Sequence, residues 1–250
     1  MNIKAKIRRI LPPFLYDRLR GHSNVTLEGS YTVPYEMLEL GNSKYFLPSY
    51  ALHRPACSMM MDGQTYEPDT HRIVALLLDS LDGNLVHAGT FFGDMLPAFA
   101  ATGKRIYAFE PVLENYVLAR LCMIENGLSN VLLYHSALGE GQGTVKMDVG
   151  DGKHKGGSSH VADDGQITSL LSIDSICPEN IAVIQLDVEG HELPALEGAR
   201  ETILRDNPVI MIEDNKAMCA PFLTELGYEQ VGEIPGLRIW SNGRDISALL

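Results

Sequence analysis

Residues 84–94 read NLVHAGTFFGD, and this stretch decides the fold class of the chain. The largely apolar residues 84–88 predict a short buried strand, which two glycines four positions apart follow at once. Glycine lets a backbone turn tightly and approach a ligand closely. We therefore expect a strand, a ligand-binding turn and then a helix around residues 96–101.

The chain continues as an alternation of apolar runs and helical patterns. Strands are predicted at residues 105–109, 131–134, 181–186 and 208–212, and helices at residues 114–126, 193–205 and 217–226. Continuous apolar strands that alternate with helices are typical of a parallel sheet covered on both faces. Residues 228–231 and 237–240 are expected to close this sheet as an antiparallel pair. The predicted class is α/β, with a doubly wound sheet.

The length of 250 residues fits one large domain with an appendage. We expect an N-terminal extension over residues 1–75, rich in loops from 21 to 70, and the main domain over residues 76–250. A glycine-rich insertion at about 139–174 interrupts the alternation, and we expect a hairpin there with a mobile tip. Long loops in compact domains are usually functional or disordered.

The net charge of −12 argues against a general nucleic-acid binder, because such proteins neutralise phosphates with Lys and Arg. Residues 1–20 are nevertheless basic and amphipathic. They predict either peripheral contact with an anionic membrane or a partner, or a terminal helix packed on its own domain. Four scattered cysteines fit free thiols, so we expect a cytoplasmic protein, with residues 1–20 as the candidate contact to the inner membrane surface.

An acid ends the second predicted strand about twenty residues after the glycine turn. Glu110 in that place can accept hydrogen bonds from both hydroxyls of a ribose. Phe91 replaces the middle glycine of a dinucleotide fingerprint, and Asp94 near the helix start would repel phosphates. S-adenosylmethionine, which is positive and carries no phosphate, fits better than a nicotinamide dinucleotide.

Five motifs resemble the FkbM-type S-adenosylmethionine-dependent methyltransferases. They are HAGTFFG (87–93), AFEP (108–111), SAL (136–138), SLLSID (169–174) and LDVEGHE (186–192). The resemblance covers residues 84 to about 215 and implies a Rossmann-like, seven-stranded class I methyltransferase fold. It implies that Gly89, Thr90 and Gly93 contact the methionine portion of the cofactor. It also implies that Glu110 contacts the ribose, and that Ser136 and Ala137 lie near the adenine.

One position departs from the family pattern. His87 stands where most relatives have an acid that helps to hold the amino group of the cofactor. We expect either weaker cofactor affinity or a replacement charge from Asp94 or Asp187; alternatively, His87 is a satisfied core residue. Pro111 and Tyr66 complete the predicted cofactor set, and the segment Tyr66-Glu67 is expected to close over the cofactor.

Acidic residues follow two neighbouring predicted strands. The fourth parallel strand ends in DVEGHE (187–192), and Asp214 and Asn215 follow the fifth. If these strands end side by side, Asp187, Asp214 and Asn215 form an oxygen-rich site for Mg²⁺ or Mn²⁺. The alternative is that the acids hold the cofactor and cap a helix.

Methyl transfer to oxygen requires alignment of the acceptor and removal of its proton. Asp187, Glu189 and His191 are the predicted catalytic residues, with His191 favoured by an unperturbed pKa of about 6.5. Together with the resemblance, this predicts O-methylation of a sugar hydroxyl in a glycan or glycosylated metabolite. The alternatives are O-methylation of a small-molecule natural product and a non-catalytic protein that binds cofactor or glycan.

Overall fold

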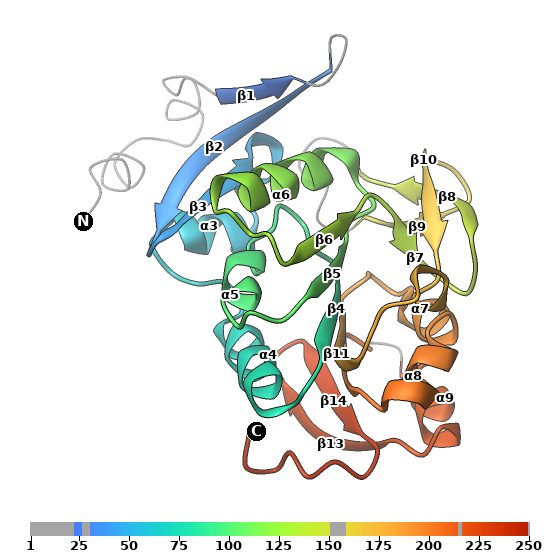
Figure 1. Ribbon diagram of the computed structural model, residues 1–250. Coiled ribbons are helices and arrows are strands. Elements are labelled where there is room, and N and C mark those ends of the chain that lie inside the picture. The colour runs from blue at the N-terminus through green and yellow to red at the C-terminus, as the bar shows by residue number, and fades with distance from the viewer. Residues whose placement is uncertain (1–22, 27–30, 151–158, 215–216, 250) are drawn as a thin grey trace.

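The computed structural model describes residues 23–26, 31–150, 159–214 and 217–249 (Figure 1). Its centre is a seven-stranded sheet in the order β13-β14-β12-β11-β4-β5-β6. The bounds are β4 Asn84–Ala88, β5 Ile106–Phe109, β6 Val131–Tyr134, β11 Ile181–Leu186, β12 Val209–Ile212, β13 Glu229–Ile234 and β14 Leu237–Ser241. The strands β6, β5, β4, β11 and β12 are parallel, and β14 is antiparallel to both β12 and β13. The predicted doubly wound sheet and its closing antiparallel pair are confirmed.

Helices cover both faces of this sheet (Figure 1). Their bounds are α4 Pro68–Ser80, α5 Leu96–Ala100, α6 Leu113–Glu125, α7 Glu192–Glu197, α8 Arg200–Asp206 and α9 Ala220–Glu225. Leu85 packs with α4 and α5 in one core cluster, whereas its neighbour Val86 packs with α7 and α8 in another. Successive strand residues point to opposite faces, so strands covered on both sides are apolar throughout.

The N-terminal extension contains more regular structure than the sequence predicts. The strands β1 Ser23–Thr26, β2 Thr32–Leu40 and β3 Ser43–Pro48 form an antiparallel sheet, followed by the short 3₁₀ helix η1 Ser49–Ala51 and by α3 Pro55–Met61. The prediction of a loop-rich segment over 21–70 was therefore wrong for much of its length. The sheet lies against α6, where Phe46 and Leu47 share a buried cluster with Leu118. This contact buries one side of the sheet, and the helix that provides it lies far from the sheet in the sequence.

The predicted domain boundary between residues 75 and 76 falls inside α4. Ile73, Val74, Leu77 and Leu78 of this helix are fully buried in the main core. α4 is therefore part of the main α/β body along its whole length. The basic segment 1–20 lies outside the described residues.

The glycine-rich insertion forms a second, four-stranded sheet. It has the order β7-β10-β8-β9, with β7 Ala137–Leu138, β8 Gly143–Asp148, β9 His160–Ala162 and β10 Gln166–Leu171, and a 3₁₀ turn η3 Asp174–Ile176 follows. The consecutive antiparallel strands β8 and β9 correspond to the predicted hairpin. Residues 151–158, where its tip was predicted, lie outside the described part of the chain.

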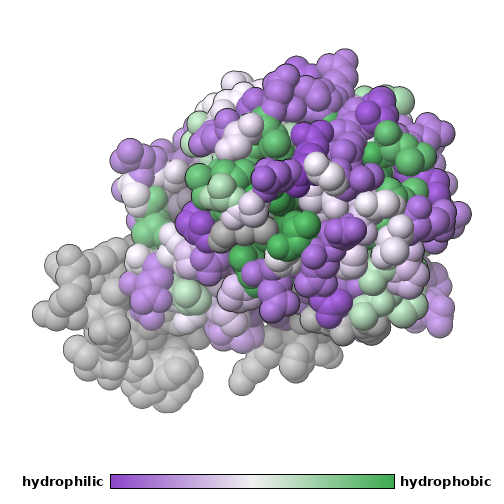
Figure 2. All heavy atoms as spheres, turned by 90° about the horizontal axis from the view of Figure 1, so that it is seen from below, coloured by the Kyte–Doolittle hydropathy of each residue, from purple (hydrophilic) through white to green (hydrophobic). Residues whose placement is uncertain are grey.

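The face shown in Figure 2 is mainly hydrophilic, and apolar side chains occur there in small groups separated by polar ones. Among the described residues, no helix is both long and apolar enough to cross a bilayer.

Candidate functional site

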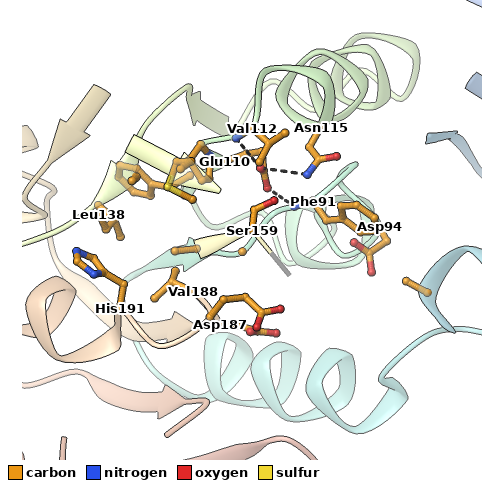
Figure 3. Close-up of a pocket in the computed structure, with 18 of the residues that line it drawn as sticks. Phe91, Asp94, Glu110, Val112, Asn115, Leu138, Ser159, Asp187, Val188 and His191 are labelled. Carbon is orange, nitrogen blue, oxygen red and sulfur yellow. Dashed lines mark hydrogen bonds between the residues drawn. The ribbon is translucent and has the colours of Figure 1, made fainter. Parts of the chain in front are cut away.

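A pocket of ≈ 200 Å³ opens at the carboxyl ends of the parallel strands (Figure 3). Ligands of open α/β sheets bind at this edge. Three parts of the chain line the pocket. The strand ends of the main sheet contribute most of the wall, the N-terminal extension contributes Arg54, Tyr66 and Glu67, and the insertion contributes Met147, Ser159 and Val161.

The turn after β4 depends on its glycines. Gly89 lines the pocket at φ +90°, and a Cβ at this position would lie 2.1 Å from the carbonyl oxygen of Asp187. Gly93 has φ +85°, and its N–H donates to the carbonyl oxygen of Thr90 at 2.8 Å. Thr90 and Gly93 are not part of the pocket wall. They shape the turn, and Gly89 is the member of the predicted trio that reaches the pocket.

Glu110 joins this turn to the start of α6. Its Oε2 accepts the Phe91 N–H at 2.7 Å, and its Oε1 accepts the Val112 N–H at 2.9 Å and the Asn115 amide at 3.2 Å (Figure 3). Burial raises the pKa of Glu110 to about 7, and the three donors oppose that rise. A carboxylate offers about four acceptor positions. Three protein donors therefore leave Glu110 able to accept one further hydrogen bond from the pocket.

His87 does not line the pocket. Its ring is 1% exposed and packs edge-on against Phe99 at a centroid distance of 5.3 Å, and its Nδ1 hydrogen bonds to Oε1 of Gln185. Burial lowers the pKa of His87 to about 4, so the ring is neutral at pH 7. The structure places His87 in the core beneath α5, away from the pocket, as in the alternative interpretation. The ring is not fully satisfied, however, because its buried Nε2 has no hydrogen-bond partner.

Acidic groups gather at one end of the pocket. Asp94 is buried, and desolvation followed by the charge of Glu67 raises its pKa to about 7. Tyr66 lines the same wall, and its hydroxyl hydrogen bonds to Glu67. Asp94 and Tyr66 were predicted cofactor residues. The sequence placed Glu67 over the cofactor together with Tyr66, but it did not indicate that Glu67 acts on Asp94.

Asp187 belongs to a carboxyl pair. Burial and the neighbouring Glu213, which also hydrogen bonds to it, raise the pKa of Asp187 well above its usual range. Glu213 directly follows β12, and its N–H donates to the carbonyl oxygen of Leu186 at 3.0 Å. Parallel strands that end side by side therefore bring Asp187 and Glu213 together. The sequence indicated this meeting of strand ends but assigned it to Asp214.

The turn 187–192 is closed by one of its own acids. Glu192 Oε1 accepts the N–H groups of Val188 and Gly190, each at 3.1 Å. Glu189 lines the pocket with φ +55°, and burial raises its pKa. The acids of this motif thus divide into one that holds the turn and two, Asp187 and Glu189, that face the pocket.

His191 lies at the other end of the pocket from Asp94, beside Leu138 (Figure 3). Its Nε2 would be 3.4 Å from a Cβ on Gly139, and burial lowers its pKa, which favours the neutral ring. Ser136, Ala137 and Pro111 line the pocket too. The Ser136 hydroxyl donates to the carbonyl oxygens of Ala137 and Ser169 at 2.8 and 3.0 Å.

The predicted metal centre of Asp187, Asp214 and Asn215 is not supported. The Asp214 carboxylate accepts the N–H groups of Met218 at 2.9 Å and Cys219 at 3.1 Å, so it organises the turn before α9. Asn215 lies outside the described residues. Within the ranges that the structure describes, no group of three or more His, Cys, Asp or Glu side chains could hold a metal ion. The sequence grouped Asp214 with Asp187, whereas its carboxylate turns to its own loop. The position of a residue at a strand end does not show which way its side chain turns.

A doubly wound sheet with a glycine turn after β4, and a pocket-facing acid after β5, defines the α/β class that binds adenosine-containing cofactors. The family description "Methyltransferase FkbM domain" matches residues 87–233, more than half of the chain. The chain belongs to this family of S-adenosylmethionine-dependent methyltransferases. A search of the curated proteins found no match.

Several solved structures are similar to this chain at low identity. Methyltransferase FkbM from Methylobacillus flagellatus is 20% identical with a TM-score of 0.48, over 77% of this chain and 55% of that one. This chain therefore spans only about half the length of that protein. An O-methyltransferase from Bacillus cereus in complex with SAH is 15% identical with a TM-score of 0.43, over 70% of this chain and 80% of that one. An rRNA methylase from Streptococcus thermophilus is 15% identical with a TM-score of 0.39, over 70% and 95%.

Proposed function

We propose that this protein is an O-methyltransferase that methylates a hydroxyl group of a sugar in a glycan or a glycosylated metabolite. The observation that carries this proposal is the Asp187 carboxyl group, which lines the pocket and is hydrogen bonded to Glu213. Two carboxyl groups this close share one proton and keep one negative charge between them. The pair can therefore accept the proton which a hydroxyl loses on methylation.

The residues present fit the cofactor of the family. Gly89 lines the pocket, and its lack of a side chain lets its backbone pack closely against the Asp187 carbonyl oxygen. Glu110 has an acceptor position left for a ribose hydroxyl, and Pro111, Ser136 and Ala137 continue the wall from this point. When bound, S-adenosylmethionine supplies a methyl group already activated by its sulfonium. The protein then has to orient the acceptor and take up its proton.

Within this proposal, the carboxyl pair takes up the proton through Asp187, its member in the pocket wall, and Glu189 orients the acceptor. Both side chains face the pocket from the same turn, and both have raised pKa values because of burial. A raised pKa makes a carboxylate a better base near neutral pH. His191 is neutral and lies toward Leu138, so we assign it to shaping that end of the pocket.

The charge of the pocket favours an uncharged, hydroxyl-rich acceptor. Carboxyl groups line it at Glu67, Asp94, Glu110, Asp187 and Glu189, and Arg54 alone supplies a permanent positive charge among the described lining residues. Carboxylates accept hydrogen bonds from hydroxyls but repel phosphates. This arrangement supports a sugar and argues against a nucleic acid as the acceptor.

The test is transfer of a labelled methyl group from S-adenosylmethionine to three acceptor classes: neutral oligosaccharides, small phenols and RNA. Label in the oligosaccharides, located on oxygen by NMR, would support the proposal. Label found only in phenols or RNA would contradict it. Tight oligosaccharide binding with no transfer would contradict it too, and would identify a non-catalytic binding protein.

A further inference from the structure

Glu67 comes from outside the region that matches the family. It directly precedes α4, twenty residues before the match begins at residue 87. Its backbone is in the left-handed region at φ +47°, which is uncommon for a residue other than glycine. Surrounding structure must hold such a conformation, and it is frequent at ligand sites.

The Glu67 carboxyl group is fixed in orientation. Its Oε2 accepts the Thr70 hydroxyl at 3.2 Å, and the Tyr66 hydroxyl hydrogen bonds to it from the preceding residue. Thr70 is 1% exposed and Glu67 lines the pocket. The side chain is therefore held toward the pocket instead of extending into solvent.

The charges next to Glu67 are negative. Glu67 acts electrostatically on Asp94 and Asp187, and Glu213 acts on Glu67. The pKa values of Glu67, Asp94 and Asp187 are all raised. The main cause is loss of hydration on burial, and repulsion by neighbouring carboxylates adds to it. A bound cation at this end of the pocket would relieve that repulsion.

The position at which family resemblance implies an acid does not provide one. His87 is neutral, is buried against Phe99 and does not line the pocket. The methionine portion of the cofactor carries an α-ammonium group, which needs a carboxylate from elsewhere in the chain.

We propose that Glu67 binds the α-ammonium group of the cofactor and takes over the role of the missing acid at His87. Glu67 lines the pocket with Asp94 and Asp187, the two residues that the sequence offered for this role, but it lies at the start of α4, before the first strand of the seven-stranded sheet. The cofactor site of this protein therefore begins in the N-terminal extension.

The test is calorimetric titration of the full-length protein with three ligands. S-adenosylhomocysteine carries the ammonium and carboxylate groups, its decarboxylated analogue keeps only the ammonium group, and methylthioadenosine lacks both. Glu67→Gln should weaken binding of the first two by about 10- to 100-fold, the range for a charged hydrogen bond, and leave methylthioadenosine within about twofold. Asp69→Asn is the matched control, because Asp69 is an exposed acid two residues away. It should change none of the three affinities.

Two results would overturn the proposal. One is unchanged affinity of Glu67→Gln for S-adenosylhomocysteine; the other is an equal loss for all three ligands, which would mean that Glu67 only shapes the pocket. If Glu67→Gln fails to fold, the wild-type protein decides. It must bind the decarboxylated analogue at least about tenfold more tightly than methylthioadenosine, and equal affinities would reject an ammonium-binding carboxylate. Acceptor methylation enters none of these measurements, so this inference and the proposed acceptor fail separately.

Discussion

At the scale of single residues, Glu110 does two things with one carboxyl group. It accepts hydrogen bonds from the turn after β4 and from the start of α6, and it faces the pocket. Its position was predicted from strand spacing alone. Its three donors were not, because they come from residues on two different elements.

Glu110→Gln is expected to weaken binding of S-adenosylhomocysteine about tenfold, because the amide has one acceptor atom instead of two. Glu110→Ala should weaken it further and also lower stability, since the Phe91 and Val112 N–H groups would lose their acceptor. Titration calorimetry and urea unfolding measure the two effects. The exposed control Glu140→Gln should change neither, and wild-type affinity in Glu110→Ala would remove Glu110 from the cofactor site.

Asp187→Asn is expected to lower the methylation rate by about 10²- to 10⁴-fold, the contribution of a positioned base. Binding of S-adenosylhomocysteine should stay within a few-fold, because the amide keeps the shape of the carboxyl group. His191→Gln should lower the rate much less, and Glu229→Gln on an exposed strand should not lower it. The measurement is the methylation rate of each variant with the best acceptor among the three classes tested above. A larger loss in His191→Gln than in Asp187→Asn would make His191 the base.

At the scale of elements, the turn between β4 and α5 combines two separate demands on glycine. Gly89 has a positive φ and also lacks room for a Cβ, whereas Gly103 has a positive φ of +74° with nothing within 4 Å. The two positions therefore separate backbone strain from steric overlap.

Gly103→Ala is expected to lower the free energy of unfolding by about 1–2 kcal/mol, the cost of a left-handed conformation with a side chain. Gly89→Ala should cost roughly 1–3 kcal/mol more, because its Cβ would overlap the Asp187 carbonyl oxygen and displace the turn. It should also weaken S-adenosylhomocysteine binding, and Gly103→Ala should not. Urea unfolding and calorimetry measure both. Equal losses of stability in the two variants would show that the turn relaxes easily.

The turn before α9 explains the place of Asp214. Its carboxylate holds two N–H groups, so Asp214→Ala is expected to lower stability by about 0.5–2 kcal/mol, as loss of a helix cap does. Binding of S-adenosylhomocysteine should be the same in EDTA and in Mg²⁺. Thermal unfolding measures the loss of stability, and calorimetry measures binding of S-adenosylhomocysteine with and without Mg²⁺. A clear gain in affinity with Mg²⁺, abolished in Asp214→Ala, would restore the predicted metal site.

At the scale of the whole molecule, buried acids couple stability to pH. Burial raises the pKa of both Asp94 and Glu110 to about 7, above the ordinary values of 3.8 for Asp and 4.5 for Glu. Between about pH 4 and 7 the folded protein therefore binds more protons than the unfolded chain. By linkage, its stability falls as pH rises through this window.

The Tm is expected to be higher at pH 5 than at pH 8, and a double variant with Asp94→Asn and Glu110→Gln should show a smaller difference. Thermal unfolding at pH 5, 6, 7 and 8 makes the measurement. A Tm that rises steadily from pH 5 to pH 8 in the wild-type protein would show that these acids are ionised in the folded state without penalty.

The sequence by itself determined the α/β class, the seven-stranded sheet, the glycine turn and the family. These follow from local patterns, because an apolar run, a glycine and a short motif carry their meaning within a few residues. Glu110 and the pocket-facing DVEG turn belong to the same group, since strand ends in such a sheet meet at one edge.

Only the tertiary structure decided which acids face one another. Glu67 lines the pocket from the start of α4, before the seven-stranded sheet begins. Glu213 pairs with Asp187, Asp214 hydrogen bonds within its own loop, and His87 points into the core. Neighbouring positions along a strand point to opposite faces, and a turn can reverse a side chain within one residue. The direction of each acid therefore depends on contacts with residues far away in the chain, and no short stretch of sequence contains them.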